Sequence, residues 1–126
     1  MSSDSAALQG LRVLIVEDEA LVAMLLEDML GDLGCQVVET CSRVPPALAR
    51  VQDVDAPLDV AILDMNVAGE ASGPVAEALA ARGVPFVFAT GYGSGGLPDA
   101  WRDRPTLQKP FGMKEVEARL REATGR

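Results

Sequence analysis

The sequence predicts an α/β fold in which a doubly wound, five-stranded parallel sheet lies between two layers of helices. Five short apolar runs recur along the 126 residues, and helical patterns separate most of them. The central runs are continuously apolar, as strands buried on both faces require. Strands that alternate with helices favour a parallel sheet covered on both sides, so the three-layer α/β class follows.

The chain starts with a strand and a helix. Residues 11–16, LRVLIV, predict a buried strand, and residues 20–34 predict a helix that ends at Gly34. The 3.6-residue spacing puts four apolar side chains on one face of this helix: Val22, Leu25, Met29 and Leu33. We expect residues 1–10 to be a short N-terminal extension and residues 11–126 to form one domain.

Two further strand–helix pairs follow. Residues 35–41 predict the second strand, and residues 42–53 predict a helix with Ser42 as its N-cap and prolines in its first turn. The run LDVAILD, residues 58–64, predicts the third strand, and residues 72–83 predict a short helix.

The last third of the chain lacks one regular helix. VPFVFAT, residues 84–90, predicts the fourth strand, PTLQKP, residues 105–110, a short fifth one, and residues 112–123 the last helix. The stretch GYGSGG, residues 91–96, has poor helix propensity because four of its six residues are glycine. We therefore expect the helix between the fourth and fifth strands to be short or absent.

Composition excludes several classes of function. Acidic residues outnumber basic ones 19 to 11, and the net charge of -8 repels phosphate backbones, so we expect no nucleic-acid partner. The chain has no histidine, the commonest general base. Its start has no basic segment followed by an apolar one, and no apolar run is long enough to span a membrane. We expect a cytoplasmic protein without a membrane partner.

Polar residues follow the predicted strands at the points where those strands end. Glu17 and Asp18 come after the first strand, Asp64 ends the third, Thr90 the fourth, and Lys109 follows the fifth. Ligands of open α/β sheets bind beyond the carboxyl ends of the strands. Each residue alone has an ordinary explanation, such as a helix cap or a surface charge. Their convergence on one edge of the sheet predicts a functional site.

These residue types suit phosphoryl transfer. Clustered carboxylates repel one another unless a cation offsets them, and their oxygens suit Mg²⁺. A carboxylate can attack phosphorus to form an aspartyl-phosphate, and Asp64 stands alone on its loop as the candidate nucleophile. Asp18 and Glu17 are then the candidate metal ligands. Lys109 would hold the charge of the phosphoryl oxygens, and Thr90 would donate its hydroxyl to them.

Four motifs, VLIVEDE, ILDMN, FAT and KPF, give the chain a resemblance to the receiver domains of bacterial two-component response regulators. The resemblance spans nearly the whole chain. It implies a flavodoxin-like sheet of strand order 2-1-3-4-5 and a phosphoacceptor at Asp64. It also implies Mg²⁺ held by Glu17, Asp18, Asp64 and the backbone carbonyl of Asn66. A phosphoryl-binding pair, Thr90 and Lys109, and a cis peptide between Lys109 and Pro110 complete the implied site.

Three positions depart from that family. Thr106 stands where the family has an aromatic switch residue, Ala68 where its loop has a proline, and the glycine stretch where its fourth helix begins. The strand end Phe-Ala-Thr-Gly-Tyr resembles a sub-group of receivers that often occur as single domains. The resemblance implies a sensor histidine kinase of the HWE or a related type as partner.

The glycine stretch has three interpretations. A phosphate-binding P-loop is excluded because the Gly-Lys-Ser/Thr ending is absent. The stretch is either a plain surface connector or a segment that becomes ordered when Thr90 moves toward a phosphoryl group. In the second case Tyr92 would take the role that Thr106 cannot fill.

The leading hypothesis is a stand-alone signalling receiver, not an enzyme with a separate substrate. It would signal by contact with a downstream protein or by onward phosphoryl transfer, since the chain ends at Arg126 after the last predicted helix. The alternatives are a fragment of a larger response regulator, a degenerate receiver that only binds, and a Mg²⁺-dependent phosphohydrolase. Haloacid-dehalogenase-type phosphatases need a second acid two residues after the nucleophile, where this chain has Asn66.

Overall fold

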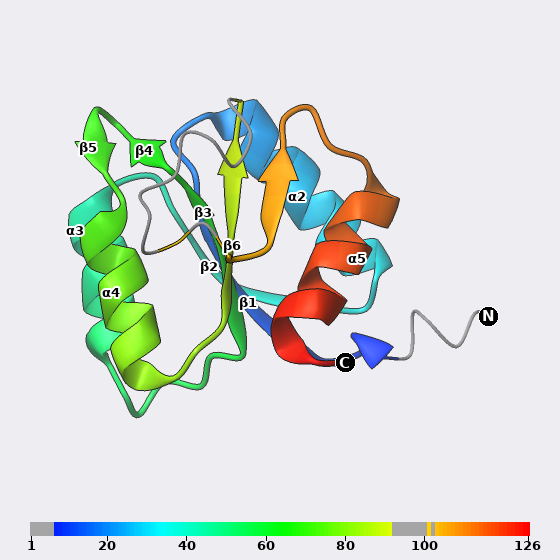
Figure 1. The fold of residues 1–126 in the computed structure, drawn as a ribbon, viewed down its shortest axis with the longest axis horizontal. Coiled ribbons are helices and arrows are strands. Elements are labelled where there is room, and N and C mark those ends of the chain that lie inside the picture. Colours follow the sequence, from blue (N-terminus) through cyan, green and yellow to red (C-terminus); the bar gives the residue numbers. More distant parts are fainter. Residues whose placement is uncertain (1–6, 92–100, 102) are drawn as a thin grey trace.

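Five parallel strands form the central sheet of the computed structural model, which describes residues 7–91, 101 and 103–126. The sheet order is β2-β1-β3-β6-β7, which confirms the predicted order 2-1-3-4-5 once a small separate hairpin is set aside (Figure 1). The strands are β1 (Arg12–Val16), β2 (Gln36–Cys41), β3 (Val60–Asp64), β6 (Phe86–Thr90) and β7 (Thr106–Gln108).

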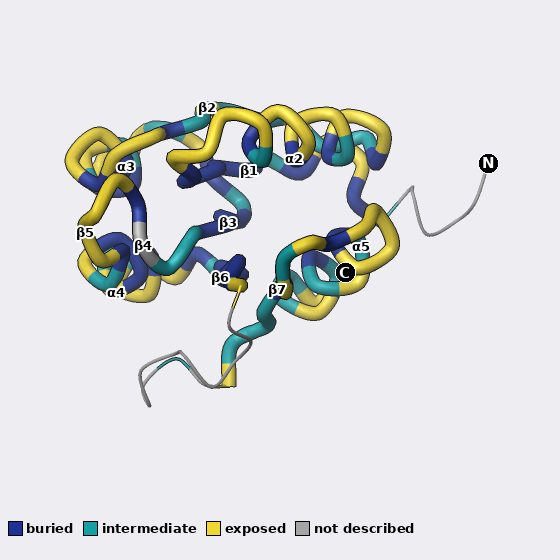
Figure 2. The backbone as a smooth tube through the Cα atoms, turned by 90° about the horizontal axis from the view of Figure 1, so that it is seen from above, coloured by how far each residue is buried: buried dark blue, intermediate teal, exposed yellow. Residues whose placement is uncertain are grey.

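Helices cover both faces of this sheet and make three layers. They are α2 (Ala20–Asp32), α3 (Val44–Gln52), α4 (Gly73–Arg82) and α5 (Met113–Thr124). Seen from above, α3 and α4 lie on one side of the sheet and α2 and α5 on the other (Figure 2). Each side has its own buried apolar cluster. The predicted three-layer architecture is confirmed.

The burial of each strand matches its place in the sheet. All five residues of β6 are buried, and so are the first four of β3, which lies between β1 and β6. The edge strands β2 and β7 keep exposed or half-buried residues. Only the central strands need apolar residues on both faces, which explains why their sequences are continuous apolar runs.

The segment before β1 takes part in the core. Leu8 is completely buried in the cluster under α2 and α5, and the amide of Gly10 donates to the carbonyl of Gly34 at 2.8 Å. The predicted domain boundary after residue 10 stays a prediction. The burial of Leu8 shows that the described segment before β1 contributes to the core of the domain.

Two details of the predicted helices are wrong. The buried face of α2 carries Ala23, Leu26 and Leu30, whereas Leu25 is 47% exposed. The first turns of α2 are apolar all round, so spacing alone does not determine which side faces the sheet. The N-cap of α3 is Arg43 instead of Ser42, and it makes no capping hydrogen bond through its side chain.

A short antiparallel hairpin between β3 and α4 was not predicted. Its strands are β4 (Asn66–Val67) and β5 (Glu70–Ala71), and both turn residues have positive φ, 52° at Ala68 and 81° at Gly69. Positive φ at both central positions defines the tight turn whose twist fits a two-residue hairpin. The hairpin begins at Asn66, two residues after Asp64.

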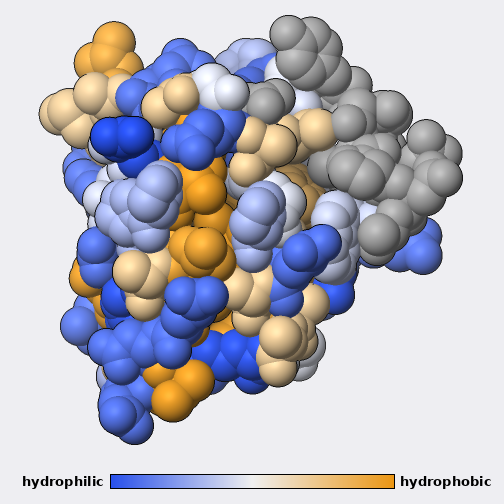
Figure 3. Space-filling model, turned by 90° about the vertical axis from the view of Figure 1, so that its left-hand side faces the viewer, coloured by the Kyte–Doolittle hydropathy of each residue, from blue (hydrophilic) through white to orange (hydrophobic). Residues whose placement is uncertain are grey.

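The face that carries α3 and α4 is shown in Figure 3. Apolar side chains reach the surface in a strip between polar ones, where the two helices pack together. Arg82 of α4 adds hydrogen bonds to the carbonyl oxygens of Val51 and Ala56 near the end of α3. These contacts fix the C-terminal end of α4 against α3 and the loop that follows α3.

The predicted short or absent helix after Gly91 falls on residues 92–100, which lie outside the described residues. Among the residues that are described, no helix is both long and apolar enough to cross a membrane.

Candidate functional site

The predicted site residues meet at one edge of the sheet. Glu17 and Asp18 follow β1, Asp64 is the last residue of β3, Thr90 is the last of β6, and Lys109 follows β7. All of these strands run parallel, so their carboxyl ends share the upper edge of the sheet in Figure 1. The structure thus brings together the strand-end residues that the sequence singled out.

The ammonium group of Lys109 lies among three carboxylates. Its Nζ is 2.9 Å from Glu17 Oε1, 3.1 Å from Asp64 Oδ2 and 3.6 Å from Glu19 Oε1. Burial alone would lower the pKa of Lys109, but its contacts with Glu17 and Asp64 outweigh burial and raise that pKa. Lys109 therefore stays charged and serves as the counter-ion of the acidic cluster.

Glu17 is the buried member of the cluster. Its side chain is only 1% exposed, and its Oε2 accepts a hydrogen bond from the Glu19 amide at 3.1 Å. Burial raises the pKa of Glu17 to about 7, although Lys109 and the Glu19 amide act in the opposite direction. Its Oε1 pairs with Lys109 by charge but has no hydrogen bond of good geometry within the described residues. This buried oxygen can accept another cation.

Glu17, Asp18 and Asp64 form a group that fits a small divalent cation. One carboxylate oxygen from each lies within 4.8 Å of the others. Carboxylate oxygens are the ligands that Mg²⁺ prefers, and Mg²⁺ binds through few carboxylates while it keeps several waters. The three-carboxylate donor set therefore suits this ion.

Asp18 is exposed, but its carboxylate is held in place. Its Oδ2 accepts a hydrogen bond of 3.0 Å from the amide of Ala68, at the turn of the β4–β5 hairpin. This contact joins the end of β1 to the loop after Asp64 across 50 residues of sequence. Neither the hairpin nor this contact was predicted from the sequence.

The hydroxyl and switch positions lie next to Lys109. Thr90 is buried, and its carbonyl oxygen accepts a hydrogen bond of 2.8 Å from the Lys109 amide. Thr106 lies in β7 and donates its hydroxyl to the Arg104 carbonyl oxygen at 3.1 Å. Tyr92, the other predicted switch residue, lies outside the described residues. The peptide between Lys109 and Pro110 is cis, as predicted.

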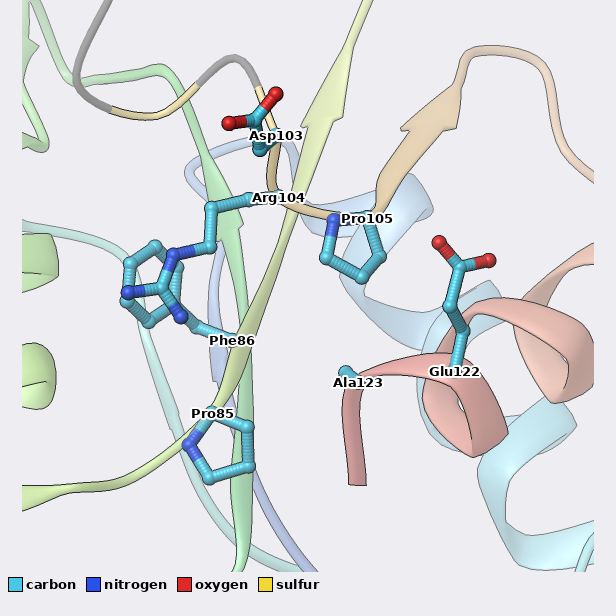
Figure 4. Close-up of a pocket in the computed structure, with 7 residues that line it drawn as sticks. All are labelled: Pro85, Phe86, Asp103, Arg104, Pro105, Glu122 and Ala123. Carbon is cyan, nitrogen blue, oxygen red and sulfur yellow. The ribbon is translucent and has the colours of Figure 1, made fainter. Parts of the chain in front are cut away.

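An apolar cavity of about 340 Å³ adjoins the acidic cluster, between the first turns of α2 and the segment after β7. Its lining residues are Glu19, Val22, Leu25, Lys109, Pro110 and Phe111. A second cavity of about 350 Å³ lies at the opposite, amino-terminal end of β6 and β7 (Figure 4). There the Arg104 guanidinium lies 4.5 Å from the centre of the Phe86 ring. The second cavity shares no residue with the strand-end site.

Comparisons with known proteins point to one group of signalling proteins. The solution structure of SdrG from Sphingomonas melonis Fr1 is 51% identical in sequence, with a TM-score of 0.79 over 95% of this chain and 96% of that one. A second SdrG structure, described as the BeF3-activated conformation, is 53% identical over 86% of this chain and 92% of that one, with a TM-score of 0.74.

Two other relatives belong to response regulators. The REC domain of the PhyR response regulator from Erythrobacter litoralis is 29% identical, with a TM-score of 0.76 over 93% of this chain and 92% of that one. The two-component response regulator PhoP of Pseudomonas aeruginosa is 30% identical over 121 residues, 87% of this chain. The chain spans half the length of PhoP. No protein-family model matches the sequence.

Proposed function

Because the chain belongs to the receiver domains of two-component response regulators, we propose that it accepts a phosphoryl group on Asp64 from a histidine kinase. The observation that carries this proposal is the position of the Asp64 carboxylate at the end of β3. It lies 3.1 Å from the Lys109 ammonium and within the carboxylate group that fits a divalent cation. A nucleophile, a fixed positive charge and a cation site thus meet at one point.

The reaction is a transfer between two side chains. An oxygen of the Asp64 carboxylate attacks the phosphorus of a phosphohistidine, the phosphorus–nitrogen bond breaks, and its electron pair returns to the imidazole of the donor. Glu17, Asp18 and the backbone carbonyl of Asn66 would hold Mg²⁺ together with Asp64. When bound, Mg²⁺ would neutralise part of the charge on the phosphoryl oxygens.

Lys109 and Thr90 stabilise the phosphorylated form of Asp64. Asp64 gives up its charge as a free carboxylate and gains a phosphoryl group, so the ammonium of Lys109 moves its pairing from the carboxylate to a phosphoryl oxygen. Glu17 and Glu19 keep Lys109 in reach, because both lie within ion-pair distance of Nζ. The Thr90 hydroxyl would donate to another phosphoryl oxygen, and the Lys109 amide bonded to Thr90 links the two residues.

The output of the phosphorylated domain belongs to the same proposal. We expect a cytoplasmic signalling domain, not an enzyme with a separate substrate, which acts on a downstream protein or passes the phosphoryl group on. The Phe-Ala-Thr-Gly-Tyr strand end favours the single-domain sub-group and a kinase of the HWE or a related type. Tyr92 and Thr106 are the candidate switch residues between Asp64 and the partner surface.

Phosphorylation with acetyl phosphate and Mg²⁺ tests the proposal without knowledge of the kinase. The wild-type protein should gain one phosphoryl group, measured by intact-protein mass spectrometry, and should lose it on treatment with hydroxylamine. Asp64→Asn should gain none, while the control Asp32→Asn, at an exposed position at the end of α2, should be labelled like wild type. Labelling of Asp64→Asn at the wild-type level would disprove the assignment.

A further inference from the structure

The β4–β5 hairpin has a feature that the phosphorylation chemistry alone does not require. The amide of its turn residue Ala68 donates a hydrogen bond to Asp18 Oδ2 at 3.0 Å. We propose that this turn positions Asp18 for cation binding, so that hairpin order and Mg²⁺ affinity are coupled. The inference rests on the proposed function, because it takes Asp18 as a ligand of the cation.

The hairpin is fixed at its base. Val67 is completely buried in the core under α3 and α4. Ser72, just after β5, is also buried, and both its amide and its hydroxyl donate to the carbonyl oxygen of Met65, at 3.0 and 3.1 Å. The turn that carries the Ala68 amide is therefore anchored on both sides.

The turn itself depends on an uncommon backbone conformation. Ala68 has φ of 52° and Gly69 has φ of 81°. A side chain with a β-carbon disfavours this left-handed region, whereas glycine and asparagine tolerate it. The Ala68 amide can point at Asp18 only while this turn is closed, so the anchors at Val67 and Ser72 must offset the strain at Ala68.

The orientation of the Asp18 side chain depends on the Ala68 amide. It is exposed, and its side chain receives no other hydrogen bond from the described residues. The Oδ2 atom of Asp18 accepts the hydrogen bond from the Ala68 amide, and this bond fixes the orientation of the carboxylate. The Oδ1 atom then remains available to the cation. Hydrogen bonds that orient metal ligands typically change metal affinity by about 10–100-fold when they are lost.

Gly69 allows the turn to be tested without touching any site residue. A β-carbon at Gly69 would meet no atom within 4 Å, so Gly69→Ala changes only the cost of the left-handed backbone. Gly69→Asn adds a larger side chain but tolerates the same conformation. Gly83→Ala is the matched control for general destabilisation, because Gly83 has φ of 77° and equally open space at the C-cap of α4, away from the site.

Mg²⁺ affinity should be measured by NMR titration for wild type and these three variants. Gly69→Ala should bind Mg²⁺ about tenfold more weakly, and both Gly69→Asn and Gly83→Ala should bind like wild type. Equal affinity of Gly69→Ala and wild type would overturn the inference. So would an equal loss in Gly69→Ala and Gly83→Ala, because the effect would then be general instability. Absence of Mg²⁺ binding in wild type would instead count against the proposed function.

Hydrogen exchange of the Ala68 amide provides a second readout that does not depend on metal. In Mg²⁺-free protein this amide should exchange more slowly in wild type than in Asp18→Ala, because only wild type has the carboxylate acceptor. If closure of the hairpin turn strengthens Mg²⁺ binding, Mg²⁺ binding must stabilise the closed turn by the same free energy. Mg²⁺ should therefore slow the exchange of the Ala68 amide further in wild type. Exchange rates that are equal in wild type and Asp18→Ala, or unchanged by Mg²⁺, would refute the coupling.

Discussion

Replacement of Lys109 by glutamine should destabilise the metal-free domain near neutral pH and above, but much less in mild acid. The substitution removes the ammonium group that lies 2.9 Å from Oε1 of Glu17, whose side chain is 1% exposed. In wild type burial raises the pKa of Glu17 to about 7, so this carboxyl is mostly ionised at about pH 8 and mostly neutral at about pH 5.5. In Lys109→Gln the pKa of Glu17 should rise further, because a buried charge has lost its partner.

The size of the effect follows from that titration. At about pH 8, one pH unit above the pKa of Glu17 in wild type, ionisation of Glu17 stabilises the wild-type fold by roughly 1 kcal/mol. If Glu17 stays neutral in Lys109→Gln, the variant lacks this stabilisation. The cost of leaving a buried polar group unpaired is of the same order, about 1–3 kcal/mol. At about pH 5.5 both proteins contain neutral Glu17, and this part of the difference should disappear.

Urea denaturation in the presence of a chelator measures the difference directly. The stability that protonated Glu17 contributes is fully present below its ordinary pKa of 4.5 and is lost as the pH rises through about 7. Wild type should therefore gain stability as the pH falls from about 7 to 4.5, and Lys109→Gln should begin to gain it at a higher pH, so the two proteins should differ at about pH 8 and converge at about pH 5.5. Glu17→Gln, alone and combined with Lys109→Gln, should flatten both profiles. A loss in Lys109→Gln that is equal at both pH values would refute the assignment of the pH dependence to Glu17.

Two other outcomes are expected. Asp18→Ala should abolish Mg²⁺ binding and phosphorylation. Asn66→Ala should largely preserve metal binding, because the proposed ligand is the backbone carbonyl of Asn66. The reverse ranking in a metal titration would contradict the proposed ligand set. Leu8→Ala should lower the free energy of unfolding by about 2–5 kcal/mol, because this is the usual cost of truncating a fully buried leucine side chain. A change below about 1 kcal/mol in urea denaturation would show that Leu8 does not belong to the folded core.

Most of the sheet and the strand-end cluster could be predicted because single segments of the sequence carry the signal. The apolar run of β3 and the acid that ends it are adjacent in sequence, and parallel strands place such ends together whatever the loops do. The cis Lys109–Pro110 peptide followed from the family resemblance and is confirmed.

What could not be predicted depends on contacts between segments or on weak local signals. The turn Ala68-Gly69 is not one of the Asn-Gly or Asp-Gly pairs that indicate a tight hairpin, and strands of two residues show no alternation. The burial of Leu8 depends on α2 and α5, which close over it from distant parts of the chain. The exposed side of α2 could not be assigned because Leu21, Met24 and Leu25 are as apolar as its buried residues.

The arrangement of the chain ends has a practical consequence. Leu8 and the turn that follows it lie beside the amino-terminal end of β1, and α5 runs back to the same edge of the sheet before the chain reaches Gly125. Asp64 and Lys109 lie at the opposite edge. A surface linker, fluorescent protein or affinity tag joined after α5 would therefore project away from Asp64 and Lys109. Protein immobilised through that end would leave the strand-end cluster of Asp64 and Lys109 facing solution.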